Sequence, residues 1–419
     1  MTTHLNKKLI VAILLIGGVI MSIEFMKSPE RAQYRAPGTS EISLDMALQN
    51  QLSPTAPEAS SCADGSCTST RPLADDPLVN TPPAVALVPV SPARVAEKQK
   101  QYKRAQEIVS PAGFLNLAAE QTSLKLADLV GKKVILVDFW TYSCINCQRT
   151  TPYLNAWYEK YKDQGLEIVG VHTPEFMFEK ERENVAEAIA RMGINYPVVQ
   201  DNDYGTWFAY GNRYWPRKYL VDIDGFVVYD HIGEGGYELT EKQIQLALAE
   251  RSLVLGLNET IKTGTVSASV DVPAGGPISP ETYFGFERNQ FLANGARGVP
   301  GEQAFTVPIA PSLGGLYLGG TWNLAGEHAE NKTAGAKIVY RYQAKNVYFV
   351  ASAQSGTKVT VLRDGVPVSA EAGADVQNGS VTVQSDRLYH LVHEPAPGEH
   401  TLELIIESPG LKAFTFTFG

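Results

Sequence analysis

Apolar and polar positions divide the chain after residue 91 into two regions with different periods. From Lys132 to Val254, apolar runs such as VILVDFW and LEIVGVHT alternate with helical patterns such as EKERENVAEAIARM. Strand patterns separated by helical ones, closing with a hairpin at Asp224-Gly225 and a last helix, predict a mixed α/β domain over residues 112–262. Before it, the charged run over residues 92–109 predicts a solvated basic helix within a connecting segment, residues 92–111.

The C-terminal region has a different pattern. After about Thr263, short alternating runs such as VYRYQAKNVYFVAS and TKVTVLRDGVPV are broken by Gly, Pro and Asp-Gly turns. Alternation with a period of two and frequent turns predicts an all-β domain over residues 263–419, arranged as an antiparallel sandwich or jelly roll.

The N-terminal 91 residues have neither pattern. Lys7 and Lys8 precede a continuous apolar run from Leu9 to Met21, which is typical of an export signal. No small-x-small cleavage motif follows closely, so an uncleaved signal anchor over residues 1–26 is favoured over a cleaved peptide. Residues 27–91 are rich in Pro, Ala, Ser and Thr and predict a disordered linker. We therefore expect an inner-membrane anchor with periplasmic domains.

Charge and cysteine content narrow the chemistry. The net charge of -9 and the absence of a basic stripe argue against nucleic-acid binding. Cys144 and Cys147 lie two residues apart where a buried strand leads into a helix. The free amides and positive dipole end of a helix favour a thiolate at Cys144, while Cys147 is placed to resolve a mixed disulfide. The cysteine pair needs no other cofactor.

Several motifs carry a family resemblance. VDFWTYSCINCQRTTP resembles the active-site segment of the thioredoxin superfamily, and YGNRYWPRKYLVDIDG its cis-proline segment. With GVHTPEF and ETYFGFER, they resemble the extracytoplasmic thioredoxin-like plus carbohydrate-binding-module-like part of DipZ proteins, which are relatives of TlpA and ResA. The resemblance covers about residues 112–419. It implies a thiol:disulfide oxidoreductase that reduces disulfides of proteins, in cytochrome c maturation or envelope thiol homeostasis.

The resemblance also implies roles for single residues. Asp138 would shuttle a proton for Cys147, with a structural acid paired to a lysine as the alternative. Pro216 would form a cis bond and present backbone to an extended substrate, and Trp215 and Trp140 would wall the site. DipZ proteins carry a multi-span electron-transporting part ahead of this region, whereas this chain has a single apolar segment. Its electrons are therefore expected from a separate membrane donor of the CcdA or DsbD kind.

Other interpretations stay open. Cys62 and Cys67 in the linker predict a local disulfide, with a second redox pair as the sharper alternative and metal capture as the least favoured. Zinc at Cys144 and Cys147 lacks two ligands, which His390 and His393 are not expected to supply, because residues three apart on a strand point to opposite faces.

Two further functions compete with disulfide exchange. Thr141 lies three residues before Cys144, and this Thr-x-x-Cys arrangement resembles that of peroxiredoxins. On this interpretation the chain would be a thiol peroxidase. A glycan-binding protein with an accessory thiol domain is the third possibility, because exposed aromatic rings stack on sugars. The candidate rings are Tyr283, Phe284, Phe286, Trp322 and Tyr340.

Overall fold

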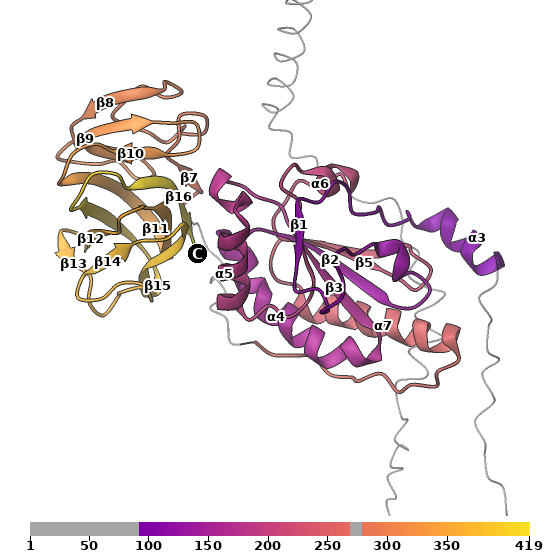
Figure 1. Ribbon diagram of the computed structural model, residues 1–419. Helices are drawn as coiled ribbons and strands as arrows, with labels where there is room; N and C mark the ends of the chain where they lie inside the picture. The colour runs from indigo at the N-terminus through magenta and orange to yellow at the C-terminus, as the bar shows by residue number, and fades with distance from the viewer. Residues whose placement is uncertain (1–91, 269–278) are drawn as a thin grey trace, which may run out of the picture. The chain divides into compact units, whose positions relative to one another are not determined.

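The computed structural model describes residues 92–268 and 279–419. The predicted anchor (1–26), the predicted linker (27–91) and its pair Cys62 and Cys67 lie outside the described residues. Among the helices that are described, none is long and apolar enough to span a membrane. The described chain forms an α/β domain, from β1 to α7, and a β domain, from β7 to β16, which Figure 1 shows in sequence colours.

The α/β domain is built on a six-stranded sheet in the order β1-β4-β3-β2-β5-β6. β2 is parallel to β3 and antiparallel to β5, which places β2 at the centre. Every residue of β2 is buried, because β-branched and aromatic side chains alternate onto two covered faces. The strands are β1 (Gly113–Leu115), β2 (Val134–Trp140), β3 (Leu166–His172), β4 (Val198–Gln200), β5 (Arg217–Val221) and β6 (Val227–Ile232).

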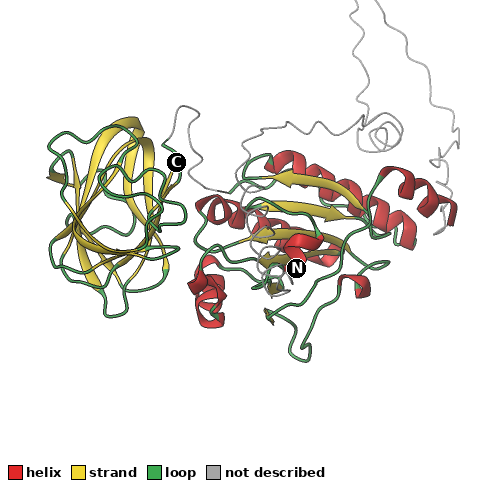
Figure 2. Ribbon diagram, turned by 90° about the horizontal axis from the view of Figure 1, so that it is seen from above, coloured by secondary structure: helices red, strands yellow, loops and turns green. Residues whose placement is uncertain are grey.

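Helices cover this sheet on both faces. α4, α5 and α7 pack against Val134, Leu136 and Ile168, while α6 and the segment before β2 pack against Ile135, Val137 and Phe139. Figures 1 and 2 show α4 and α7 side by side on one face of the sheet. The helices are α4 (Ile145–Tyr161), α5 (Arg182–Met192), α6 (Gly205–Ala209) and α7 (Tyr237–Leu255), with short 3₁₀ helices η1 (Leu126–Asp128), η2 (Lys162–Gln164) and η3 (Met177–Lys180). The predicted thioredoxin-like α/β domain is therefore confirmed.

The connecting helix is shorter than expected. α3 spans Pro92–Gln101 instead of residues 92–109. Beyond it, the backbone of Lys103 accepts a hydrogen bond from Val227, and Ala105 donates one to Gly225. These bonds to the β5–β6 hairpin replace the helical ones, so the chain continues in an extended form.

The C-terminal region is all-β, as predicted. In place of two separate sheets, its strands form one ten-stranded hydrogen-bonded sheet, which Figure 2 shows curling around its own interior. The reason is β11, which pairs with β9 along its first half and with β16 along its second half. The strands are β7 (Thr282–Tyr283), β8 (Gly301–Phe305), β9 (Leu316–Leu324), β10 (Ala329–Asn331), β11 (Ala336–Ser352), β12 (Thr357–Arg363), β13 (Val366–Pro367), β14 (Ser380–Val383), β15 (Arg387–Ile406) and β16 (Lys412–Phe418).

Candidate active site

The two cysteines lie at the N-terminus of α4. Cys144 is the N-cap residue in an extended conformation, and its carbonyl accepts the first helical hydrogen bond, from the Gln148 amide, at 3.0 Å. Cys144 is half-buried, Cys147 is 2% exposed, and both are free thiols. The structure thus gives the predicted order of buried strand, loop and helix, with the half-buried Cys144 at the positive end of the helix dipole.

Cys147 is held as a thiol by its surroundings. Burial raises its pKa well above the ordinary value, and a hydrogen bond with Cys144 and the charge of Cys144 add to this effect. A backbone hydrogen bond at Thr141 acts in the opposite direction. Because the charge of Asp138 also raises this pKa, Cys147 can ionise only if its proton has an acceptor.

Asp138 is that candidate acceptor, and it has a cationic neighbour. The side chain is 1% exposed, and burial raises its pKa to about 7, although Lys218 lowers it in part. Lys218 is the cross-strand partner of Asp138 on β5, and its Nζ lies 3.8 Å from Oδ1 of Asp138. Asp138 is thus both desolvated, which suits a proton shuttle, and paired with a lysine, as the alternative of a structural acid expected.

Lys218 was not singled out from the sequence. It is fully buried, and its Nζ donates to the Gly233 carbonyl at 3.4 Å. Burial lowers its pKa, while the charges of Asp138 and Cys147 raise it. A lysine two residues after Pro216 inside the apolar strand pattern was the available signal, but only the register of β5 against β2 places it beside Asp138.

The three residues expected to contact substrate differ in exposure. The Trp215–Pro216 peptide bond is cis, as predicted, and Pro216 is buried. Trp215 is half-buried and packs on Trp207, with ring centroids 4.3 Å apart. Trp140 is only 2% exposed and lies over Gly170, where a Cβ would come within 2.9 Å of its indole nitrogen. Trp140 therefore packs in the core cluster that also contains Cys147, and its expected role as a wall of the site stays a prediction.

The loop before Cys144 is fixed by buried polar groups. Ser143 donates from both its amide and its hydroxyl to the carboxylate of Glu179, a buried residue of η3 that sequence reasoning missed. Tyr142 stacks on His172, the last residue of β3, with ring centroids 5.6 Å apart. Burial lowers the pKa of His172 to about 3, so this strand-end residue is neutral.

The β domain covers part of the active-site helix. Ile145, the residue after Cys144, is 6% exposed because it belongs to an apolar cluster shared with the β domain. Arg149 donates to the hydroxyl of Tyr348 at 3.3 Å and pairs with Glu234. The cluster consists of Ile145, Phe176, Tyr283, Tyr348, Val350, Leu388 and Phe414. No pattern near the cysteines indicated this contact.

Glu175 takes part in the same contact. Its Oε1 accepts hydrogen bonds from Tyr283 and Arg288, each at 2.8 Å. It lies in the loop before η3 and contacts the β domain.

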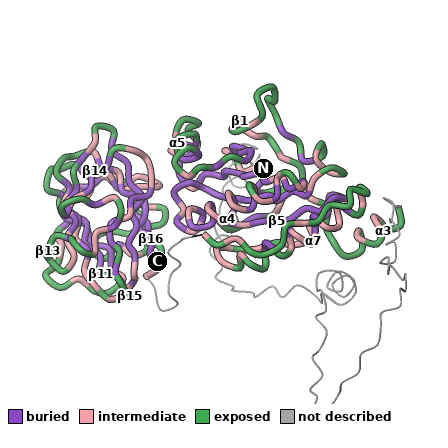
Figure 3. Tube along the Cα trace, turned by 90° about the horizontal axis from the view of Figure 1, so that it is seen from below, coloured by how far each residue is buried: buried purple, intermediate pink, exposed green. Residues whose placement is uncertain are grey.

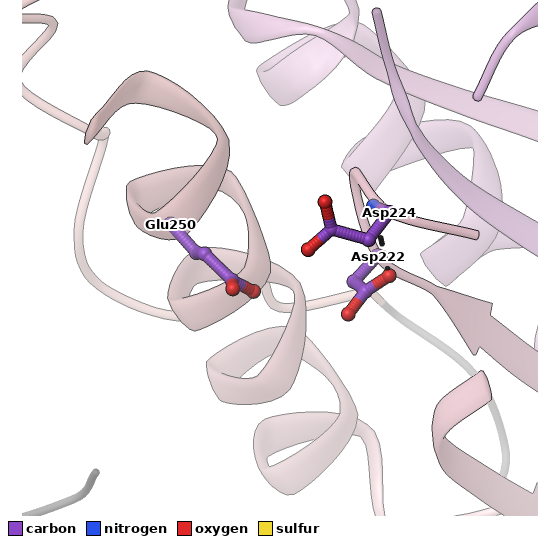
Figure 4. Close-up of side chains that lie close together, drawn as sticks. All are labelled: Asp222, Asp224 and Glu250. Atoms are coloured by element: carbon purple, nitrogen blue, oxygen red, sulfur yellow. Dashed lines mark hydrogen bonds between the residues drawn. The ribbon is translucent and has the colours of Figure 1, made fainter. Parts of the chain in front are cut away.

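One acidic cluster of the described chain has the geometry of a metal site. Figure 4 shows Glu250 from α7 facing Asp222 and Asp224 of the β5–β6 turn. The ammonium of Lys98 on α3 hydrogen-bonds all three carboxylates, at 2.6 Å from Asp222 and 3.1 Å from Asp224. Burial alone would lower the pKa of Lys98, but Glu250 and Asp222 more than offset this and raise it. The cluster is therefore a docking point for α3, whose other charged residues, such as Glu97 and Lys100, stay exposed as predicted.

His390 and His393 also differ from expectation. Both rings hydrogen-bond to Oδ1 of Asn346, at 3.1 and 2.7 Å, so the prediction that they point to opposite faces is wrong. The cause is a β-bulge, since Val347 pairs with Val392 while Tyr348 pairs with His390, which leaves one extra residue on β15.

The aromatic residues proposed as sugar platforms are mostly internal. Tyr283, Phe284, Trp322 and Tyr340 are buried, and Phe286 packs partly against the same core. A buried ring cannot stack on a sugar, so these side chains do not form an exposed binding face.

Comparisons with known proteins agree with this geometry. A family model described as "AhpC/TSA family" matches residues 103–230, and one described as "Thioredoxin like C-terminal domain" matches residues 279–419. "Protein DipZ" of Mycobacterium tuberculosis is 38% identical over 315 residues, covering 75% of this chain and 43% of DipZ. The chain thus spans less than half the length of that relative.

Two shorter relatives are covered over most of their length. "Thiol-disulfide oxidoreductase YkuV" of Bacillus subtilis is 33% identical over 122 residues, which are 29% of this chain and 82% of YkuV. "Thiol-disulfide oxidoreductase ResA" of Halalkalibacterium halodurans is 32% identical over 131 residues, which are 31% of this chain and 71% of ResA. The chain belongs to the thioredoxin-like thiol-disulfide oxidoreductases.

Proposed function

We propose that Cys144 and Cys147 are the redox pair of this protein and that they reduce disulfides of exported proteins. The observation that carries the proposal is the asymmetry of the pair. Cys144 is half-buried at the N-terminus of α4, whereas Cys147 is buried together with Asp138. One sulfur is placed to attack a partner and the other to act only after that attack.

The exchange runs in two steps. The Cys144 thiolate attacks one sulfur of the substrate disulfide, which forms a mixed disulfide and releases the other substrate sulfur as a thiolate that takes up a proton. Cys147 then gives its proton to Asp138 and attacks the Cys144 sulfur. The substrate leaves as a dithiol, and the protein keeps the Cys144–Cys147 disulfide. Trp215 and the backbone before Pro216 are the proposed contacts for an extended substrate.

The reductive direction requires an electron supply. Exported compartments favour disulfides, so the oxidised pair must be reduced again by a membrane dithiol donor of the CcdA or DsbD kind. Inner-membrane anchoring through residues 1–26 would keep the domains near such a donor, and Cys62 and Cys67 would relay electrons or form a local disulfide. Cytochrome c apoproteins or other envelope thiols are the proposed clients.

Trapping of covalent partners tests this function. The Cys147→Ser variant of the full chain, expressed in its native host, should hold clients on Cys144 as mixed disulfides that a Cys144→Ser/Cys147→Ser control does not hold. Purified wild-type protein should reduce insulin with dithiothreitol as donor, and Cys144→Ser should not. Equal insulin reduction by both proteins would overturn the proposal.

Peroxide reduction is the second candidate, because residues 103–230 match the AhpC/TSA family model. The hydroxyl of Thr141 weighs against it, since it is buried and lies 3.5 Å from Nε2 of His172. Consumption of hydrogen peroxide that depends on Cys144 and outpaces insulin reduction would favour this candidate over disulfide exchange.

A further inference from the structure

Glu179 is a buried carboxylate with an unusual set of partners. It is 0% exposed, and each of its oxygens accepts two hydrogen bonds. Oε1 accepts from the Ser143 amide at 3.2 Å and the Ser143 hydroxyl at 2.6 Å. Oε2 accepts from the amides of Glu175 at 2.6 Å and Phe176 at 3.0 Å. Four donors on two oxygens fit an ionised carboxylate, which has no proton of its own to place.

These bonds join two places that matter for the redox pair. Ser143 directly precedes Cys144, so its amide and hydroxyl fix the approach of the chain to the nucleophile. Glu175 accepts from Tyr283 and Arg288 of the β domain, and the ring of Phe176 packs on Phe414, with centroids 5.1 Å apart. Glu179 is thus the one described side chain that hydrogen-bonds both the nucleophile loop and the segment contacted by the β domain.

The charge of Glu179 also acts on the site. A negative charge bonded to the backbone before Cys144 opposes the positive end of the α4 dipole, which otherwise stabilises a thiolate. Burial and the charge of Glu175 raise the pKa of Glu179, and the bonds from Ser143, Thr141 and Phe176 offset this only in part. Stabilising the thiolate stabilises the reduced protein, which makes the protein a weaker reductant. A site that stabilises the thiolate less is therefore the more reducing one.

We propose that Glu179 is a positioning residue of the dithiol site, which fixes Ser143 and Cys144 against the β-domain contact and restrains ionisation of Cys144. This inference rests on the proposed role of Cys144 as nucleophile. It assigns the β domain a part in the redox site, because the same carboxylate is held in place by the segment that the β domain covers.

The Glu179→Gln substitution in the full chain tests the charge. The rate at which iodoacetamide alkylates Cys144 is measured as a function of pH. Peptide mass spectrometry distinguishes this cysteine from the other three. We expect the midpoint to move to lower pH and the rate below the midpoint to rise about threefold or more. The equilibrium with glutathione should move toward the dithiol by a similar factor.

Glu241→Gln is the matched control. Glu241 is 1% exposed and accepts hydrogen bonds from Tyr161, Lys160 and Val266, but it lies on α7 and bonds no residue of the nucleophile loop. It should leave the Cys144 midpoint unchanged. A folded Glu179→Gln protein with the wild-type midpoint and the wild-type glutathione equilibrium would overturn the proposal.

Ser143→Ala keeps every charge and removes only the 2.6 Å donor. We expect kcat for insulin reduction to fall several-fold with little change in KM, while Ser252→Ala, at another buried serine on α7, has no effect. A wild-type kcat for Ser143→Ala would contradict the positioning role. If wild-type protein fails to reduce insulin, the proposed function fails, but the alkylation shift of Glu179→Gln still decides this inference.

Discussion

Asp138 and Lys218 face each other from β2 and β5, and both side chains are buried. Each is charged at a cost, because burial disfavours both ionic forms, and the 3.8 Å separation is too long for a strong hydrogen bond. Oδ1 of Asp138 has no hydrogen-bond partner among the described residues. The carboxylate of Asp138 is therefore able to take up a proton, as required of a candidate acceptor for the proton of the buried Cys147 thiol.

Asp138→Asn should change how stability depends on pH. The folded pKa of about 7 lies above the ordinary value of 3.8, so between these values the folded protein holds a proton that the unfolded chain has released. Wild-type stability therefore falls as pH rises through this window. Asn does not titrate, so the free energy of unfolding of the variant does not fall in this window. The difference, variant minus wild type, should increase by about 2 to 3 kcal/mol from about pH 5 to about pH 7. Urea unfolding at several pH values measures it; a constant difference would contradict the assignment.

Lys218→Met should raise the pKa of Asp138 above about 7, because it removes the cation that lowers it. Carboxyl carbon NMR of Asp138 measures this titration directly. Lys160→Met, which removes a cation paired with Glu241, is the control and should leave the Asp138 titration in place. An unchanged Asp138 titration in Lys218→Met would show that the charge of Lys218 does not affect the pKa of this carboxyl.

The residues that sequence reasoning found are those marked by short spacings. Cys144, Cys147, Asp138 and Pro216 all lie in or beside motifs of a few residues. Lys218 lies inside the quoted motif YGNRYWPRKYLVDIDG and Glu179 three residues after GVHTPEF, but their roles depend on strand register and loop packing, which these motifs do not give. Trp140 followed the motif but turned inward, since a residue two positions from Asp138 on a strand shares its buried face.

At the scale of elements, α3 is held by one lysine. Lys98 pairs with three carboxylates whose oxygens lie within 4.8 Å of one another, and Arg94 adds a second pair with Asp224. Figure 3 draws α3 in green and pink, and none of its residues is buried, so little of the helix packs against the domain. Its docking therefore depends on charge more than on burial.

Lys98→Met should release α3, because Asp222 and Glu250 would lose the cation that they share and only the pair of Arg94 with Asp224 would remain of these contacts. We expect the free energy that holds α3 on the domain to fall by about 2 to 4 kcal/mol, which should appear first as local unfolding of residues 92–104. Hydrogen exchange and limited trypsin cleavage in this segment report it. Lys100→Met removes an exposed lysine paired only with Glu97 and is the matched control. Equal protection of α3 in both variants would refute this account of docking.

Element boundaries that depend on distant partners were the ones missed. The charged pattern continues to residue 109, yet α3 ends at Gln101 because the hairpin at Gly225 and Val227 captures the next backbone groups. Strand alternation likewise does not reveal bulges. One in β16, where Ala351 pairs with Ala413 and Val350 with Thr415, turns Phe414 out of the β-domain core.

At the scale of the whole molecule, that outward Phe414 joins the two domains. Its ring lies 4.8 Å from the centroid of Phe178 and 5.1 Å from that of Phe176, both in the α/β domain. Phe416, two residues later, instead packs on Phe284 and Phe349 inside the β domain. Substitutions at Phe414 and Phe416 can therefore distinguish a loss of the contact between the domains from a loss of stability of the β domain.

Phe414→Ala should uncouple the domains without unfolding either one. Removing a buried aromatic ring costs about 3 to 5 kcal/mol, and here the cost falls on the contact between domains. Calorimetry should show wild-type protein unfolding in one transition and Phe414→Ala in two, with Ile145 more exposed to solvent. Phe416→Ala should instead lower the β-domain transition. If Phe414→Ala still unfolds in one transition at the wild-type temperature, the apolar cluster does not couple the domains, and the covered state of Ile145 needs another cause.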